Sequence, residues 1–358
     1  MSTKLLHFIV FSLVGLAVFL TGYLFSRNSD NFNQQALIDN SLVTRFNKTD
    51  EKYVAPTGLF ELTSKESSFP KVSTSGELWY YIPENGEIRS ITIKNPTIGT
   101  TLLTKIGPNA NYISWADNKT LIAKFPTGAI FYNISSNTSK KYDPLITNPV
   151  LNKSGTKIAY SYFNKETGEG NISLADPNLE SYKNILPTRF ANWQIKWLDD
   201  IRLAITKPPT LENATSSIYI LDTETGSLKN ILEFKNSLEI AWANTGESLI
   251  YSYADDSDKE TSLFYFDLIS KNQQEIFSKA LASACTWSIN NKIVYCAEPD
   301  SFISIDTSIT EPLLKKLTGS VPVEVTKNAT NLLLNSTEDY LIFKNSKTGK
   351  LYGLQLEN

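Results

Sequence analysis

Histidine, cysteine and methionine are almost absent from this sequence. Its 358 residues include one histidine, two cysteines and one methionine. The histidine, His7, lies in an apolar run near the N-terminus, so the rest of the chain has no imidazole. This lack excludes a Ser-His-Asp or Cys-His catalytic group and any zinc or iron site built on histidine. We therefore predict that the protein is not an enzyme and that it has no cofactor.

Runs of basic residues are missing as well. Lysine and arginine total 34, aspartate and glutamate total 37, and the formal net charge is −3. A nucleic-acid-binding surface needs a basic stripe that neutralises phosphates, so the sequence predicts that the protein does not bind nucleic acid. The hydrophobic fraction of 41% and the charged fraction of 20% indicate a folded chain.

Carboxylates allow two kinds of site that need no histidine. A suitably spaced pair could hydrolyse a glycosidic bond, but most acidic residues lie in expected hairpin turns, where they satisfy backbone groups. The segment Asp255–Glu260 alternates oxygen ligands as a calcium loop does. It lacks the glycine and the distal glutamate of an EF-hand loop, so we expect a solvated turn there.

The first long apolar run predicts a membrane anchor. Leu5–Phe25 has no formal charge, and as a helix it would span about 30 Å, the thickness of a bilayer core. A cleaved signal peptide has a shorter apolar region and a small-x-small exit, which Leu20–Phe25 does not offer. We expect a cytoplasmic tail over 1–4, a transmembrane helix over 5–25 and a polar tether over 26–67. The large domain would then lie outside the cytoplasm, in the periplasm or at the cell surface.

A repeated sequence motif fills the remainder of the chain. Each copy has an anchor residue, a polar turn and a second apolar strand, as in Ile240–Tyr251. Seven anchors recur at intervals of 36–46 residues, and the residue seven places after each is apolar. A constant offset across a turn predicts hairpins that share one register. The anchors are Val72, Trp115, Leu151, Trp197, Trp242, Trp287 and Val325.

Two further strands follow each hairpin, with turn residues between them. Four short strands in each such interval are typical of a propeller blade. The sequence therefore predicts an all-β fold, a seven-bladed β-propeller of four-stranded antiparallel blades over 68–358, preceded by one N-terminal transmembrane helix. The blades are expected near 68–109, 110–146, 147–190, 191–236, 237–280, 281–319 and 320–358.

Tryptophan occupies the anchor position in four copies, at Trp115, Trp197, Trp242 and Trp287. A tryptophan that recurs once per blade at one register is expected to pack between blades rather than to bind a ligand. Three aromatic residues lie outside this register and are better candidates for facing a ligand. They are Tyr112, Phe190 and Trp193.

These tryptophans, with the turn glycines Gly76, Gly155 and Gly246, resemble the TolB-type, WD-like propeller repeat. The resemblance covers roughly Ser68 to Asn358, although the family's turn proline is absent from every copy. It implies a propeller that binds proteins or small molecules on its ring faces, without implying one function.

We therefore expect a membrane-tethered binding or scaffolding module whose partner is a protein or an envelope component. The alternatives are a sensor of a small ligand or carbohydrate, and a carboxylate-based enzyme that processes glycans. Convergent acids in the central channel would favour the enzyme, and an aromatic pocket would favour the sensor. A broad apolar patch would favour the scaffold.

The two cysteines fall in the sixth repeat. If Trp287 lies opposite Val294, the same register places Cys285 directly opposite Cys296 on the adjacent antiparallel strand. Opposed Cα atoms lie about 4.5–5.5 Å apart, a separation that a disulfide accepts. An oxidising location favours the bridge, while two buried thiols that fill a packing position are the alternative. We predict a disulfide between Cys285 and Cys296.

The anchor prediction can be tested in membranes. Because Leu5–Phe25 lacks a cleavage site, the mature protein should begin near Met1 and stay in the membrane fraction after a carbonate wash. An N-terminal sequence that begins near Ser26 would contradict the anchor.

Overall fold

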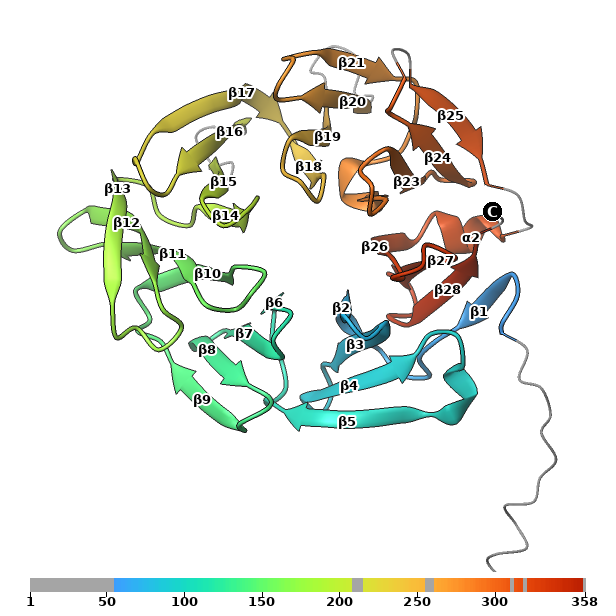
Figure 1. Ribbon diagram of the computed structural model, residues 1–358, viewed down its shortest axis with the longest axis horizontal. Helices are drawn as coiled ribbons and strands as arrows, with labels where there is room; N and C mark the ends of the chain where they lie inside the picture. Colours follow the sequence, from blue (N-terminus) through green and yellow to red (C-terminus); the bar gives the residue numbers. More distant parts are fainter. Residues whose placement is uncertain (1–54, 208–214, 255–260, 310–311, 318–320, 357–358) are drawn as a thin grey trace, which may run out of the picture. The chain divides into compact units, whose positions relative to one another are not determined.

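The computed structural model describes residues 55–207, 215–254, 261–309, 312–317 and 321–356. The described strands form seven four-stranded antiparallel sheets. Figure 1 shows these sheets standing as blades around a common axis, with the first strand of each blade nearest the axis. The predicted seven-bladed β-propeller with four-stranded antiparallel blades is therefore confirmed.

Strand order within blades 1 to 6 follows the sequence. Blade 1 contains β2 (Ser68–Val72), β3 (Glu77–Ile82), β4 (Glu87–Thr92) and β5 (Thr100–Lys105). Blade 2 contains β6 (Tyr112–Trp115), β7 (Thr120–Phe125), β8 (Gly128–Asn133) and β9 (Thr138–Lys141). Blade 3 contains β10 (Ile146–Leu151), β11 (Ile158–Asn164), β12 (Glu169–Ala175) and β13 (Tyr182–Thr188).

The next three blades repeat this arrangement. Blade 4 contains β14 (Gln194–Trp197), β15 (Arg202–Lys207), β16 (Thr215–Asp222) and β17 (Leu228–Asn236). Blade 5 contains β18 (Glu239–Trp242), β19 (Ser248–Ala254), β20 (Thr261–Asp267) and β21 (Gln273–Ile276). Blade 6 contains β22 (Cys285–Trp287), β23 (Ile293–Ala297), β24 (Phe302–Asp306) and β25 (Leu313–Lys316).

Blade 7 is built from both ends of the domain. Its strands are β26 (Ala329–Leu334), β27 (Tyr340–Asn345), β28 (Leu351–Gln355) and β1 (Leu59–Glu61). Phe60 lies opposite Gly353, where an added Cβ would come within 2.5 Å of the Phe60 ring. A larger residue in place of Gly353 would have to displace the Phe60 ring. The segment 26–67, expected to be a tether, therefore contributes a strand to the propeller.

The hydrophobic core lies between neighbouring blades. Each sheet has a blade on both sides, so both faces of its inner strands are apolar, and Leu78–Ile82 of β3 are all buried. Between blades 4 and 5, Ile218 packs with Leu249 and Tyr251, and all three are fully buried. Seven such clusters hold the described ring together.

The hairpin register differs from the uniform offset of seven. Trp242 and Trp287 do lie opposite residues seven places on, but Trp115 lies opposite Leu121 and Trp197 opposite Leu203, six places on. The turn in those blades is one residue shorter, because Ala116 N–H bonds the carbonyl of Thr120.

The anchor of blade 7 was also placed wrongly. Leu334 is the anchor, since it lies opposite Leu341, seven places on. Val325 belongs instead to the short helix α2 (Val323–Thr326) that precedes the blade.

Within the described residues, no helix is long and apolar enough to cross a membrane. The anchor expected at Leu5–Phe25 and the loop Asp255–Glu260 lie outside those residues.

The sixth blade contains the cysteine pair. Cys285 of β22 lies directly opposite Cys296 of β23, and a disulfide joins them in the structure. Both side chains are buried between blades 5 and 6.

Alkylation tests this bridge in the protein itself. The denatured, unreduced chain should take up no label, and the same sample should take up two labels after reduction. Reduction should lower the free energy of unfolding by at most about 3 kcal/mol, because the closed loop is short. Two reactive thiols per chain before reduction would show that the bridge does not form.

Candidate functional site

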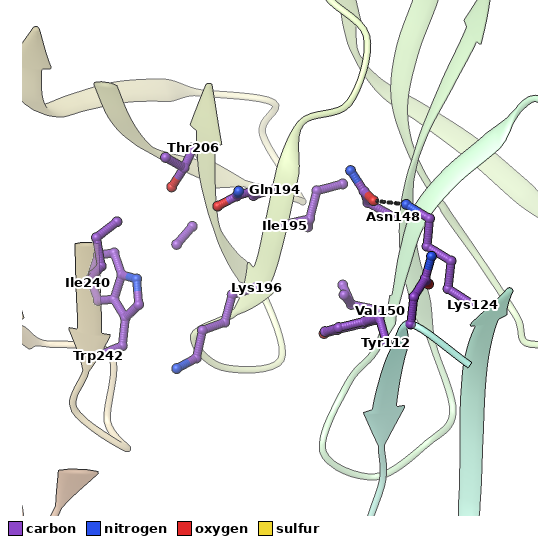
Figure 2. Close-up of a pocket in the computed structure, with 12 residues that line it drawn as sticks. Tyr112, Lys124, Asn148, Val150, Gln194, Ile195, Lys196, Thr206, Ile240 and Trp242 are labelled. Atoms are coloured by element: carbon purple, nitrogen blue, oxygen red, sulfur yellow. Dashed lines mark hydrogen bonds between the residues drawn. The ribbon is translucent and has the colours of Figure 1, made fainter. Parts of the chain in front are cut away.

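A cavity of about 560 Å³ lies between the inner strands of blades 2 to 5. This volume falls in the range of small-molecule sites. The lining residues come mainly from β6, β10, β14 and β18, and Figure 2 shows their side chains around the opening. Among the described residues that line it are two lysines, three side-chain amides and two aromatic rings, and no carboxylate.

Blade 4 supplies one wall of this cavity. Gln194 and Lys196 of β14 lie opposite Thr206 and Ala204 of β15, so all four point to the face that meets blade 5. Ile195 points the other way and packs against blade 3. Strand alternation thus places an amide, an ammonium and a hydroxyl on one face of this blade.

Lys196 occupies a position that is apolar in some blades and polar in others. It directly precedes the anchor Trp197, as Val150 precedes Leu151 and Ala241 precedes Trp242. Val150 and Ala241 pack against the next blade. Lys71, Ser114 and Thr286 hold the same position in blades 1, 2 and 6, so the position does not require an apolar residue.

The ammonium group of Lys196 has no partner. Among the described residues, none forms an ion pair or hydrogen bond with it, whereas Lys71, at the same position in blade 1, pairs with Asp117 at 2.6 Å. The Lys196 side chain is exposed to the water of the channel, yet the protein around it partly desolvates its ammonium and lowers the pKa. An unpaired cation that faces a channel is a candidate anion-binding group.

The second lysine of the cavity is held in place. Lys124 Nζ donates to Oδ1 of Asn148 at 2.8 Å, and Asn148 Nδ2 donates to the carbonyl of Trp193 at 2.9 Å. Asn148 lies in a bulge of β10 and has a φ of 49°, a conformation that asparagine tolerates better than most residues. The bulge turns this amide toward the axis, where it links blades 2 and 4.

Three of the four anchor tryptophans connect neighbouring blades. The indole N–H of Trp115 donates to the Phe69 carbonyl at 2.9 Å, that of Trp197 to Val150 at 3.1 Å and that of Trp287 to Ala241 at 3.0 Å. The fourth, Trp242, is 7% exposed and lines the cavity.

The three aromatic residues outside the register differ in their surroundings. Tyr112 is 41% exposed and lines the cavity, where desolvation raises the pKa of its hydroxyl. Trp193, a candidate for facing a ligand, is instead buried, and its indole N–H donates to Oγ1 of Thr188. Phe190 is exposed and lies beneath the Lys207 ammonium, 4.1 Å from it.

A second cavity of about 830 Å³ shares Lys196 with the first, and Asp117, Asp199 and Asp200 belong to its lining. Burial raises the pKa of the Asp199 carboxyl, yet hydrogen bonds from Ile201 and Arg202 outweigh it and hold this pKa below its usual value. Asp117 pairs with Lys71. Within the described part of the chain, no group of three or more His, Cys, Asp or Glu residues could hold a metal ion.

Solved structures of other proteins share this fold. An oligogalacturonate lyase in complex with manganese has a TM-score of 0.63 and 10% identity, over 86% of this chain and 96% of its own. The oligogalacturonate lyase of Vibrio parahaemolyticus has a TM-score of 0.61 and 11% identity, over 85% of this chain and 96% of its own. The Swd1 propeller domain of Myceliophthora thermophila has a TM-score of 0.56 and 12% identity, over 83% of this chain and 98% of its own. No protein-family model and no curated protein matches the sequence. At these identities the likeness shows the fold alone.

These structures correct the prediction that the protein is not an enzyme. Oligogalacturonate lyases are enzymes, and they have a propeller fold like this one. A lack of histidine excludes imidazole chemistry, but lysine and tyrosine can also transfer protons. The fold and composition are therefore compatible with catalysis.

The unpaired charge predicts an effect on stability. Because the folded state lowers the pKa of Lys196, the unfolded chain holds this proton more tightly, and the charged form penalises folding. Lys196→Met should therefore raise the free energy of unfolding at neutral pH, by about 0.5–1 kcal/mol after screening by channel water.

Chemical denaturation measures this gain, which should shrink as the pH rises through the lowered pKa. The exposed Lys140 of β9 provides the control, since Lys140→Met should leave stability unchanged. A Lys196→Met variant that is less stable than the wild type would contradict this account of the channel.

Proposed function

We propose that the propeller binds a small acidic saccharide in its central cavity, with Lys196 as the group that pairs with the ligand's carboxylate. The observation that carries this proposal is the ammonium of Lys196 in the central cavity, which has no partner among the described residues. An anion that enters the cavity supplies the partner that the protein does not, and charge-assisted hydrogen bonds are stronger than neutral ones.

The other lining groups match a sugar. Asn111, Gln194 and Thr206 offer donors and acceptors for hydroxyl groups, and an aromatic ring such as that of Tyr112 packs against the apolar face of a sugar ring. The cavity volume of about 560 Å³ suits one or two sugar units. A carboxylate, several hydroxyls and an apolar ring face together describe a uronic acid.

A scaffolding role has less support. The most exposed large apolar side chains, Ile98, Tyr182, Ile269 and Phe277, lie in three different blades instead of one broad patch. A protein-docking surface is expected to gather such residues. The cavity, by contrast, gathers polar and charged side chains at one place.

In this proposal the domain is a TolB-type propeller held outside the cytoplasm by Leu5–Phe25. The uncharged length of that segment supports the tether. The bridge between Cys285 and Cys296 supports an oxidising compartment, where disulfides persist. The site would then meet saccharides of the envelope or the surroundings.

The lowered pKa of Lys196 favours a second candidate, turnover of the saccharide by elimination. Neutral Lys196 would accept the proton from the carbon next to the carboxylate. The released electron pair would form a carbon–carbon double bond and expel the glycosidic oxygen from the next carbon. The departing oxygen takes a proton from solvent. The propeller fold shared with the lyases supports this chemistry.

Calorimetric titration tests the binding proposal. The protein should bind trigalacturonate and not the neutral maltotriose. Lys196→Met should weaken the affinity for trigalacturonate by about tenfold or more, because it removes a charged hydrogen bond. Lys140→Met, which lies in an outer strand, should bind as the wild type does.

Equal affinity for the two sugars, or full affinity in Lys196→Met, would overturn the binding proposal. The ultraviolet absorbance of an unsaturated uronate tests the second candidate in the same samples. Its appearance with the wild type and its loss in Lys196→Met would show turnover. Binding without absorbance would exclude turnover of this sugar.

A further inference from the structure

Trp242 differs from the three anchor tryptophans that connect blades. It holds the same register and lies opposite Leu249, yet among the described residues its indole N–H has no hydrogen-bond partner. Its side chain lines the cavity. The Trp242 side chain is 7% exposed, and its donor faces the cavity without a protein acceptor among the described residues, so it is available to a ligand.

The missing acceptor can be located by comparison with the other blades. The carbonyls of Val150 and Ala241 accept the equivalent bonds, and each of these residues directly precedes the anchor of its strand. In β14 the corresponding residue is Lys196. The unpaired ammonium and the unpaired indole N–H therefore belong to the same junction, between blades 4 and 5.

This junction is also the most open one near the axis. Of all neighbouring inner strands, β14 and β18 pack least closely. The cavity extends between them, and Figure 2 shows the Lys196 side chain extending toward Trp242 across this space. The two polar groups face an opening that protein atoms fill between other blades.

We infer that the ligand's carboxylate bridges this junction, accepting a hydrogen bond from Trp242 Nε1 while it pairs with Lys196. This inference rests on the proposed function and names a second residue that selects the ligand. One carboxylate oxygen can serve each donor, and the negative charge makes both hydrogen bonds stronger than those to the neutral hydroxyls of a sugar. Trp242 thereby discriminates in favour of carboxylates.

The bridge also couples binding to the ring. The ligand supplies the link between blades 4 and 5 that the indole N–H supplies directly at the three other junctions. Occupancy should then slow the opening of these two inner strands, which amide hydrogen exchange reports. Strands of blades 6 and 7, away from the cavity, should exchange at the same rate with and without ligand.

The matched variants are Trp242→Phe and Trp287→Phe in the full-length protein, with trigalacturonate as the probe. Phenylalanine keeps an aromatic ring and removes the N–H. Trp242→Phe should weaken binding by about tenfold, because a hydrogen bond to a carboxylate is lost, and should retain the preference over maltotriose that Lys196 provides. Trp287 holds the same register outside the cavity, so Trp287→Phe should bind as the wild type does.

Hydrogen exchange of the wild type supplies a readout that needs no variant. Trigalacturonate should slow exchange in β14 and β18. If the wild type shows Lys196-dependent binding but Trp242→Phe binds within twofold of it and β14 and β18 exchange unchanged, the bridge is wrong and the proposed function stands. If the wild type does not bind trigalacturonate, both fail together.

Discussion

Each blade of this propeller is stable only because both faces of its sheet are buried against neighbouring blades. A four-stranded sheet with two apolar faces cannot fold alone in water, so the ring must close. Closure depends on β1, whose pairing with β28 completes the last blade from the other end of the domain. The central channel follows from the same constraint. The side chains between blades hold the inner strands apart, so these strands surround the axis without filling it.

This constraint explains how much of the fold the sequence could predict. Apolar residues must recur wherever a blade faces its neighbour. Four tryptophans at the anchor position therefore allowed the number of blades to be predicted. The same register placed Cys285 opposite Cys296, as the structure has them. The sequence of Leu59–Glu61 does not reveal a strand, because three residues are too few to show a repeating pattern. This segment forms a strand only because it pairs with the edge of the last blade. The length of the first hairpin turn could not be predicted either. Offsets of six and of seven residues both place an apolar residue opposite the anchor.

The site was harder to predict, for physical reasons. Lys196 lies between two apolar residues in a segment that matches the repeat, and its place in the channel depends on a blade spacing that no single repeat encodes. Comparing the residue before each anchor does not single it out, since Lys71, Ser114 and Thr286 are polar there as well. Asn148 reaches the axis through a bulge, which shifts the strand alternation on which sequence patterns rest.

Trp242 shows that one residue can serve both packing and recognition. Its ring packs against Leu249 and Tyr251 as the repeat requires, while its N–H faces the cavity. The lack of histidine pointed away from catalysis, but a lysine whose pKa is lowered by desolvation can take part in proton transfer without imidazole. Together, Lys196 and Trp242 make the junction of blades 4 and 5 the chemically distinct part of an otherwise repetitive ring.

The most direct measurement is an experimental structure of the full-length protein with bound trigalacturonate. The account predicts one uronate in the central cavity, with one carboxylate oxygen within hydrogen-bond distance of Lys196 Nζ and the other within hydrogen-bond distance of Trp242 Nε1. A saccharide bound on an outer strand or at the opposite end of the channel, with Lys196 still unpaired, would contradict it.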